Sequence, residues 1–413
     1  MKTVDSSKNI LPSFFCGNPI VSKDTLLSVC KSYVTEELKG KKINCLFGSI
    51  HTPVLHTTKK IKEIIQKNDF DKIREVEINT LGALKPIYEH LIKNKMEAWG
   101  VFIYHDMPYF FDSSEHGLIW VRPVEKTSVK NGILYEIEQG IYVEPDKMVG
   151  IARYEILTDY DIENVIFAGL LAYVLSDIMG SGLAIDTSLL SSAFERAATE
   201  LGFEINLEVD SFYIGMTTSS LVFLVSFMGI DALWNAYNLE DTVKLQIYNW
   251  EDGFWEISQC YRENVVFVGK DNYFSSGYIF YLGYSDPQMP QVPLFIKANA
   301  DLVANCSFNT VIMSGAFMKR FGISLEFIRS CVGGGFMWAF KCPDSGNNKQ
   351  AASDGIKDLT AKMYYEKAKW NDTPLSFSFK TTYYQIPVLV GLDYLNGPRD
   401  GHYNAMINIC DVS

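Results

Sequence analysis

Residues 132–156 read GILYEIEQGIYVEPDKMVGIARYEI, and this stretch decides the fold class of the chain. It is rich in Ile, Val and Tyr, which favour β-strands. Segments 132–137 and 140–143 are predicted as two strands separated by a tight turn, and 148–156 as a further strand. Glu144-Pro145-Asp146 supplies turn-forming residues before that last strand. The stretch therefore indicates a region of short, consecutive strands.

The residues on the N-terminal side mix helices with strands. Asp24 is placed to cap a helix that Gly40 ends, and Thr57 or Thr58 begins a Lys-rich amphipathic helix. Pro86 is expected in the first turn of another helix, where a missing N–H is tolerated. The predicted helices cover 24–39, the residues after 58, and 81–95, and the predicted strands cover 43–47, 101–104 and 117–121.

The residues on the C-terminal side begin with two helices and then become β-rich. An apolar helix is predicted over 165–179, and Asp186 caps an amphipathic helix that Gly202 stops. Residues 203–210 alternate apolar and polar side chains, and 242–257 are predicted as a hairpin. The remaining predictions are strands over 265–268, 278–282, 375–379, 383–392 and 403–412, a helix over 356–370 and an exposed loop over 342–355.

The predicted fold class is α+β, with an N-terminal α+β part, a helix pair and a mainly antiparallel, β-rich C-terminal part. Strands and helices do not alternate regularly, so a doubly wound parallel sheet is not expected. Three regions are predicted: an extended arm over 1–22 with Phe14 and Phe15 as an anchor, an α+β domain over 23–157, and a helix pair plus β-rich domain over 158–413. The arm has two possible docking places, its own domain or a neighbouring molecule.

The net charge of −12 bears on the partners of the chain. Coating nucleic acid stoichiometrically requires many Lys and Arg, so that role is not expected. Residues 1–100 carry a balance of +5 and the remaining residues −17. The basic residues have two readings, a handle for phosphate or an acidic neighbouring subunit, and a solvated helix face with interleaved acidic residues. The basic-patch candidates are Lys39, Lys41, Lys42, Lys59, Lys60 and Lys62.

The eight cysteines show neither a CxxC pair nor zinc-finger spacing, which favours reduced, buried thiols. No signal peptide is expected, and the predicted location is the cytoplasm or a virion. Residues 212–230 are uncharged and nearly long enough to span a membrane, but hydroxyl residues occupy their centre and Asp210 and Asp231 flank them. No membrane span is expected, and a membrane-associated protein remains an alternative.

One polar constellation raises the possibility of catalysis. Carboxylates and imidazoles can bind a divalent cation or share a proton, and five such residues lie in a predicted loop. The candidates are His105, Asp106, Asp112, Glu115 and His116. A metal-dependent hydrolase is one interpretation, and a polar loop with aromatic anchors is the other. No catalytic residue and no cofactor is predicted elsewhere, since Gly333-Gly334-Gly335 lacks the GK[ST] ending of a phosphate loop.

Composition favours a structural role over an enzymatic one. Aromatic residues make up 14% of the chain and charged residues 21%, below the usual value of about 25%. Subunit interfaces are enriched in aromatics and depleted in charge. The chain is therefore predicted to be a structural subunit of a large assembly, such as the shell, connector or tail of a virus or phage particle, acting by non-covalent association with its own copies or with other subunits. The interface candidates are Phe14, Phe15, Tyr109, Phe110, Phe111, Phe336 and Trp338.

Overall fold

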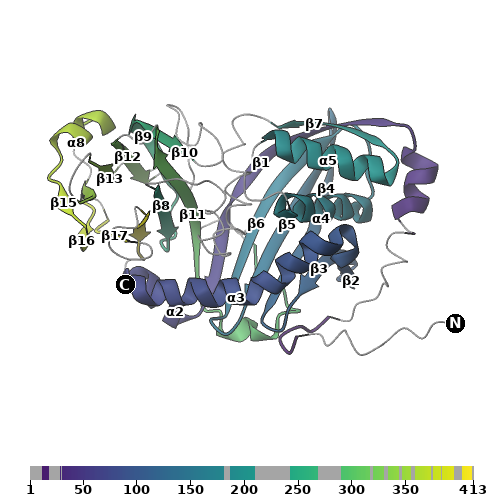
Figure 1. The fold of residues 1–413 in the computed structure, drawn as a ribbon, viewed down its shortest axis with the longest axis horizontal. Helices are drawn as coiled ribbons and strands as arrows, with labels where there is room; N and C mark the ends of the chain where they lie inside the picture. The colour runs from purple at the N-terminus through teal and green to yellow at the C-terminus, as the bar shows by residue number, and fades with distance from the viewer. Residues whose placement is uncertain are drawn as a thin grey trace.

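The structure of the chain is a computed structural model that describes residues 12–17, 28, 30–180, 187–209, 242–267, 290–316, 320–329, 334–343, 347–354, 359–373, 375–382, 384–394 and 402–411. The α+β class is confirmed, because several helices accompany large, mostly antiparallel sheets. The chain forms two lobes side by side (Figure 1). We call them the helix-covered lobe and the sandwich lobe.

The helix-covered lobe is built on a meander of consecutive antiparallel strands. Strands β2 to β6 follow one another in the sheet, and β6 pairs with β1. The strand β7 adds to the other edge of β1 in parallel, with Lys42 opposite Glu204. The strands are β1 (Lys42–Thr57), β2 (Gly100–Tyr104), β3 (Met107–Ser113), β4 (Gly117–Val129), β5 (Gly132–Val143), β6 (Met148–Thr158) and β7 (Glu204–Val209).

The strand β5 is continuous, so the turn predicted between residues 137 and 140 is wrong. Two side-chain arrangements explain the continuity. Glu138 bonds to arginines on both neighbouring strands, and Gly140 leaves room for the Trp120 ring directly opposite it. A Cβ at residue 140 would lie 1.9 Å from Cζ2 of that ring. The glycine therefore serves side-chain packing here and does not mark a turn.

Helices cover one face of this sheet (Figure 1). They are α3 (Phe70–Asn94), α4 (Asn164–Gly180) and α5 (Thr187–Leu201), with the short π-helix η1 (Val34–Leu38) and the 3-10 helix η2 (Lys95–Ala98) beside them. The buried helix predicted over 165–179 is confirmed as α4, and its one acidic residue, Asp177, pairs with Lys95 and Arg196. The predicted helix stops are also confirmed, because Gly40 and Gly202 adopt φ values of +71° and +91°.

The opposite face of the sheet is covered by two irregular segments, residues 12–17 and 290–303. Their rings form an aromatic cluster with β2 to β5, in which the centroid of Phe295 lies 5.0 Å from those of Phe102 and Tyr109. The amide of Cys16 donates to the carbonyl of Phe295 at 2.7 Å. The described part of the arm therefore docks on its own chain.

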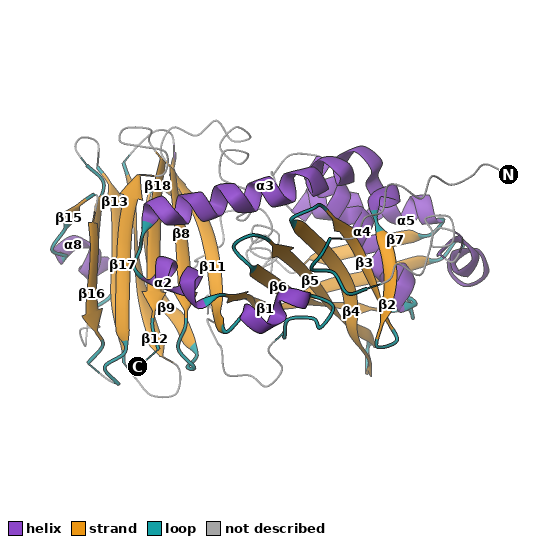
Figure 2. Cartoon of the chain, turned by 90° about the horizontal axis from the view of Figure 1, so that it is seen from below, coloured by secondary structure: helices purple, strands orange, loops and turns teal. Residues whose placement is uncertain are grey.

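The sandwich lobe packs two sheets face to face, and their strands pair antiparallel except for β18 and β8, which pair in parallel (Figure 2). One sheet has the order β16-β17-β18-β8-β11, with β10 also on β11, and the other has the order β15-β14-β13-β12-β9. The strands are β8 (Thr242–Asn249), β9 (Trp255–Glu263), β10 (Val265–Phe267), β11 (Ala304–Gly315), β12 (Phe321–Arg329), β13 (Gly335–Cys342), β14 (Lys349–Asp354), β15 (Asn371–Asp372), β16 (Leu375–Lys380), β17 (Pro387–Tyr394) and β18 (His402–Ile409). The short helix α8 (Ala361–Lys367) packs on β9, β12 and β13, whereas the 3-10 helix η3 (Lys297–Asp301) belongs to the segment 290–303 on the other lobe.

The hairpin predicted over 242–257 is wrong, although both of its strands exist. The strand β8 pairs with β11 and β18, whereas β9 pairs with β12 in the other sheet. The connection crosses between sheets because Leu245 and Trp255 both bury their side chains in the shared core. Glu251 holds the crossing by accepting from the amide of Gly253 and the indole of Trp255.

The exposed loop predicted over 342–355 is also wrong for much of its length. Residues 349–354 form β14, which pairs with β13 from Phe336 opposite Asp354 to Lys341 opposite Lys349. The polar composition of this strand led to the prediction of an exposed loop. In the structure the polar Gln350 is fully buried, and its amide oxygen accepts a hydrogen bond from the Trp338 indole at 2.9 Å. The helix that follows is shorter than predicted and begins at Ala361, capped by Thr360.

The helix α3 extends further than predicted and runs from one lobe to the other (Figure 2). It starts at the cap Asp69, so Pro86 lies in its interior and not in its first turn. A proline there cannot donate to the carbonyl four residues earlier, that of Gly82. The preceding helix α2 (Lys59–Gln66) is capped by Thr58 as predicted.

The two lobes also share core residues and one short strand pairing. Strands β1 and β11 pair only from Val54 to Thr57, opposite Ala304 to Ser307. The helices that follow residue 158 pack on the sheet formed by the residues before it, and β7 returns to β1. A division at 157 therefore separates elements that pack together.

Candidate functional site

The seven aromatic interface candidates all lie inside the molecule. The exposed fractions of Phe14, Phe15, Tyr109, Phe110 and Phe111 are between 0% and 6%, and those of Phe336 and Trp338 are 0%. The sheet of the helix-covered lobe is covered on both faces and the sandwich encloses a further core, so the fold buries many large apolar side chains. These seven aromatic residues therefore fill intramolecular cores.

The five residues of the predicted loop are distributed along a strand. Residues 107–113 form β3, and His105-Asp106 is the two-residue turn before it, with φ values of 48° and 61° as type I′ geometry requires. Glu115 and His116 lie in the turn after it, roughly 20 Å away at the usual rise per residue. Asp112 bonds to His90 on α3 at 2.8 Å. Within the described ranges, no three His, Cys, Asp or Glu residues gather as a metal site.

The six basic-patch candidates form two separate groups. Lys39, Lys41 and Lys42 are exposed at the start of β1, and Lys41 lies over the Tyr160 ring. Lys59 and Lys60 are exposed on α2, where Lys62 pairs with Asp411 at 3.1 Å. The strand β1 separates the groups by about 50 Å. They therefore do not make one surface.

The apolar segment 212–230 lies outside the described residues. Among the described residues, none of the helices combines the length and the apolar character that crossing a membrane requires.

Sequence reasoning missed an ion-pair ladder across three strands. Arg122, Glu138 and Arg153 lie directly opposite one another on β4, β5 and β6. Glu138 is fully buried and accepts from both guanidiniums at 2.8–3.2 Å. Burial alone would raise the pKa of Glu138, but the two arginines outweigh it and hold this pKa below its usual value. Little in the sequence pointed to this ladder, because Arg122 follows the predicted strand 117–121 and Glu138 falls in the predicted turn between 137 and 140.

The sheet that runs through both lobes ends in an edge strand at each side. Its path starts at β16 and ends at β2. In the described part of the chain, β2 pairs only with β3, and β16 pairs only with β17. The two edges lie at opposite sides of the molecule in both views (Figure 1, Figure 2).

The side chains of β2 do not protect its edge. Its sequence, GVFIY, has neither a charged residue nor a proline, and Ile103 is 41% exposed. Natural proteins commonly block sheet edges with Lys, Pro or a bulge, because the free N–H and C=O groups of an edge pair with other chains. On β16, Ser376 and Ser378 are exposed and uncharged, and the exposed Lys380 places a charge only at the last residue of the strand. These two edges are the candidate functional surfaces.

The chain matches neither a known family model nor a curated protein sequence.

Proposed function

We propose that the chain is a structural subunit of a large assembly, such as the shell, connector or tail of a virus or phage particle, and that it acts by non-covalent self-association. Buried aromatic rings do not support this proposal. Its support is the continuous sheet, in which β2 and β16 each pair with a single strand among the described residues and lie at opposite sides of the molecule.

The positions of the two edges favour a head-to-tail contact. Strand β2 has five residues and β16 has six, so β2 can pair with β16 along its whole length. Pairing β2 of one copy with β16 of the next joins two different surfaces. Such a contact produces a ring where the rotation closes and a filament where it does not. Repeated copies would then share one extended sheet.

Edge-blocking substitutions test this contact. We expect wild-type protein to form oligomers larger than dimers in native mass spectrometry across a concentration series. Ile103→Lys places a charge on the β2 edge and is expected to weaken association by about tenfold, equivalent to about 1.4 kcal/mol. Ser378→Lys on β16 is expected to have a similar effect.

The matched control is Ile92→Lys on α3, because Ile92 is 42% exposed and so resembles Ile103 in residue type and exposure. It is expected to leave the oligomers unchanged. A monomer at all concentrations contradicts the proposal. Disruption by Ile103→Lys alone, with a wild-type dimer, replaces the head-to-tail contact by a symmetric β2–β2 contact.

A further inference from the structure

The buried ion pair between α3 and the sheet beneath it has a side-chain amide as its neighbour. Lys244 on β8 is 1% exposed, and its ammonium donates to the carboxylate of Glu77 on α3 at 2.5 Å. Asn404 on β18 lies directly opposite Lys244 in the parallel register of the two strands. Successive side chains of a strand point to opposite faces of a sheet, and the next residues, Leu245 and Ala405, face the sandwich core. Lys244 and Asn404 therefore share the other face, which α3 crosses (Figure 2).

The amide oxygen of Asn404 is unusual for a buried group. The side chain is 4% exposed, and among the described residues this oxygen has no hydrogen-bond partner. Buried amide oxygens are normally bonded. Neighbouring strands lie about 4.8 Å apart, and a lysine carries its nitrogen on a flexible four-carbon stem. Rotation of the Lys244 stem therefore brings its nitrogen to the carbonyl carbon of the Asn404 amide.

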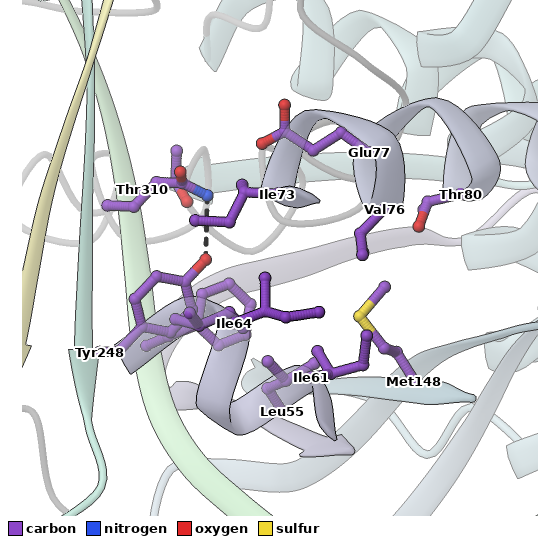
Figure 3. Close-up of a pocket in the computed structure, with 13 residues that line it drawn as sticks. Leu55, Ile61, Ile64, Ile73, Val76, Glu77, Thr80, Met148, Tyr248 and Thr310 are labelled. Atoms are coloured by element: carbon purple, nitrogen blue, oxygen red, sulfur yellow. Dashed lines mark hydrogen bonds between the residues drawn. The ribbon is translucent and has the colours of Figure 1, made fainter. Parts of the chain in front are cut away.

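The surroundings of the pair are mostly apolar. Glu77 stands at the margin of a small cavity between α2, α3 and the strands beneath them, beside Ile73 and Val76 of its own helix and Ile64 of α2 (Figure 3). Apolar surroundings make buried ions costly. Transfer of one proton along the bond from Lys244 to Glu77 removes both charges. It also leaves a free amine, which is a nucleophile.

We propose that Lys244 and Asn404 form an intramolecular isopeptide bond, with Glu77 as the catalytic proton carrier. Glu77 takes a proton from the Lys244 ammonium, and the free Nζ attacks Cγ of Asn404. Glu77 then gives its proton to Nδ2 and takes another from Nζ, so the Cγ–Nδ2 bond breaks and ammonia leaves. The products are a secondary amide, ammonia and a protonated Glu77, so atoms and charges balance without an oxidant or reductant.

The register of the strands supplies what this reaction needs most. Amines and amides react very slowly in solution, and holding the two groups side by side removes the cost of bringing them together. The ion pair is the state of Lys244 and Glu77 before the bond forms. The bond would join β8 to β18, strands that are adjacent in the sheet but far apart in the chain. This inference is independent of the proposed self-association.

Intact-mass spectrometry of the full chain, purified folded and then denatured, tests the inference. We expect the wild-type protein to be lighter than its sequence mass by one ammonia, about 17 Da. Asn404→Asp keeps the shape of the side chain and is expected to lose one water instead, about 18 Da. Fragmentation of a protease digest is expected to show a branched peptide that joins Lys244 to Asn404.

Three further variants assign the roles. Asn404→Ala is expected to keep its full sequence mass, and Glu77→Gln is expected to lower the linked fraction at least about tenfold, because it removes the proton carrier. The matched control is Asn309→Ala on β11, since Asn309 is also 4% exposed with an amide oxygen that has no partner among the described residues. The residue opposite it on β8 is Ile247, so this variant is expected to stay fully linked. Circular dichroism checks that each variant is folded.

Three results overturn the inference: a folded wild-type protein at its full sequence mass, a loss of ammonia that persists in folded Asn404→Ala, or a mass loss without the branched peptide. The last means that an asparagine has closed on its own backbone as a succinimide. Full linking in Glu77→Gln overturns the role assigned to Glu77.

Discussion

Glu138 is the residue whose environment differs most from its usual one. Its carboxylate has no solvent exposure, while the side chains of Arg122 and Arg153 on either side are 16% and 14% exposed. Three charges in one row of a sheet are favourable only while each has its partners, because an unpaired buried ion is costly. The ladder therefore fixes the register of β4, β5 and β6 as well as stabilising them.

Replacing Glu138 with Gln is expected to lower the free energy of unfolding by about 3 kcal/mol, since the mostly buried guanidinium of Arg122 loses its charged partner and Arg153 keeps only Glu136. Urea unfolding at neutral pH measures the loss. The control is Glu125→Gln on the exposed part of β4, which is expected to change stability by no more than about 0.5 kcal/mol. A loss of that size for Glu138→Gln would mean that the ladder contributes little.

The same group makes stability depend on pH in a defined direction. The pKa of Glu138 is lower in the folded chain than in the unfolded chain, where it is about 4.3. The unfolded chain therefore takes up this proton at higher pH. The stabilisation from Glu138 is complete above the unfolded pKa and is lost as pH falls through the folded pKa. Glu138→Gln is expected to flatten the acid limb of the stability profile below about pH 4, and parallel profiles for the two proteins would contradict this.

Among the helices and strands, α3 is the helix that connects the two lobes by contacting both of them. Its first half contacts the sandwich lobe, where Glu77 pairs with Lys244 on β8, and its second half contacts the helix-covered lobe, where His90 bonds to Asp112 on β3. The C-terminal half was predictable because its apolar residues repeat with helical spacing. The first half was not, since it exposes Ile78 and carries charges whose partner, Lys244, is far away in the sequence.

Glu77→Gln is expected to destabilise the protein by about 3 kcal/mol, because it leaves the Lys244 ammonium buried without a counter-charge. Glu77→Leu combined with Lys244→Met is expected to recover most of this loss, since apolar residues of similar size often replace a buried ion pair without cost. Denaturant unfolding measures both. Glu89→Gln, at an exposed pair on the same helix, serves as the control and should cost under about 0.5 kcal/mol. Equal losses for Glu77→Gln and the double variant would show that the pair is not the cause.

At the scale of the whole molecule, sequence reasoning identified most strands but not their partners. The strand over 203–210 was correct because its alternation is local, yet its partner residues on β1 lie 162 positions earlier, as Lys42 opposite Glu204 shows. The strands around residue 250 were also correct, but a turn motif does not reveal whether two strands share a sheet. For the same reason the edges at β2 and β16 could not be predicted. An edge is defined by which strands fail to pair, and that depends on the complete topology.

The shared core predicts that the two lobes unfold together. Phe308 on β11 belongs to the same buried cluster as α2 and α3, and its ring stacks on Tyr248. Differential scanning calorimetry is expected to show one transition with equal calorimetric and van't Hoff enthalpies. Phe308→Ala is expected to cost about 3–5 kcal/mol and to separate the transitions of the lobes. Phe340→Ala, inside the sandwich core alone, is expected to lower stability while keeping one transition. Two transitions in wild-type protein would contradict the coupling.

The position of β18 between β17 and β8 has a consequence for biosynthesis. This strand is central in its sheet, yet it follows β8 in the chain by more than 150 residues. At about 5–20 residues per second, a ribosome takes roughly 8–30 s to deliver it after β8 has emerged. During that interval the edge of β8 that pairs with β18 in the folded protein has no native partner strand. Nascent chains are therefore most exposed to mispairing, and most in need of a chaperone, late in translation.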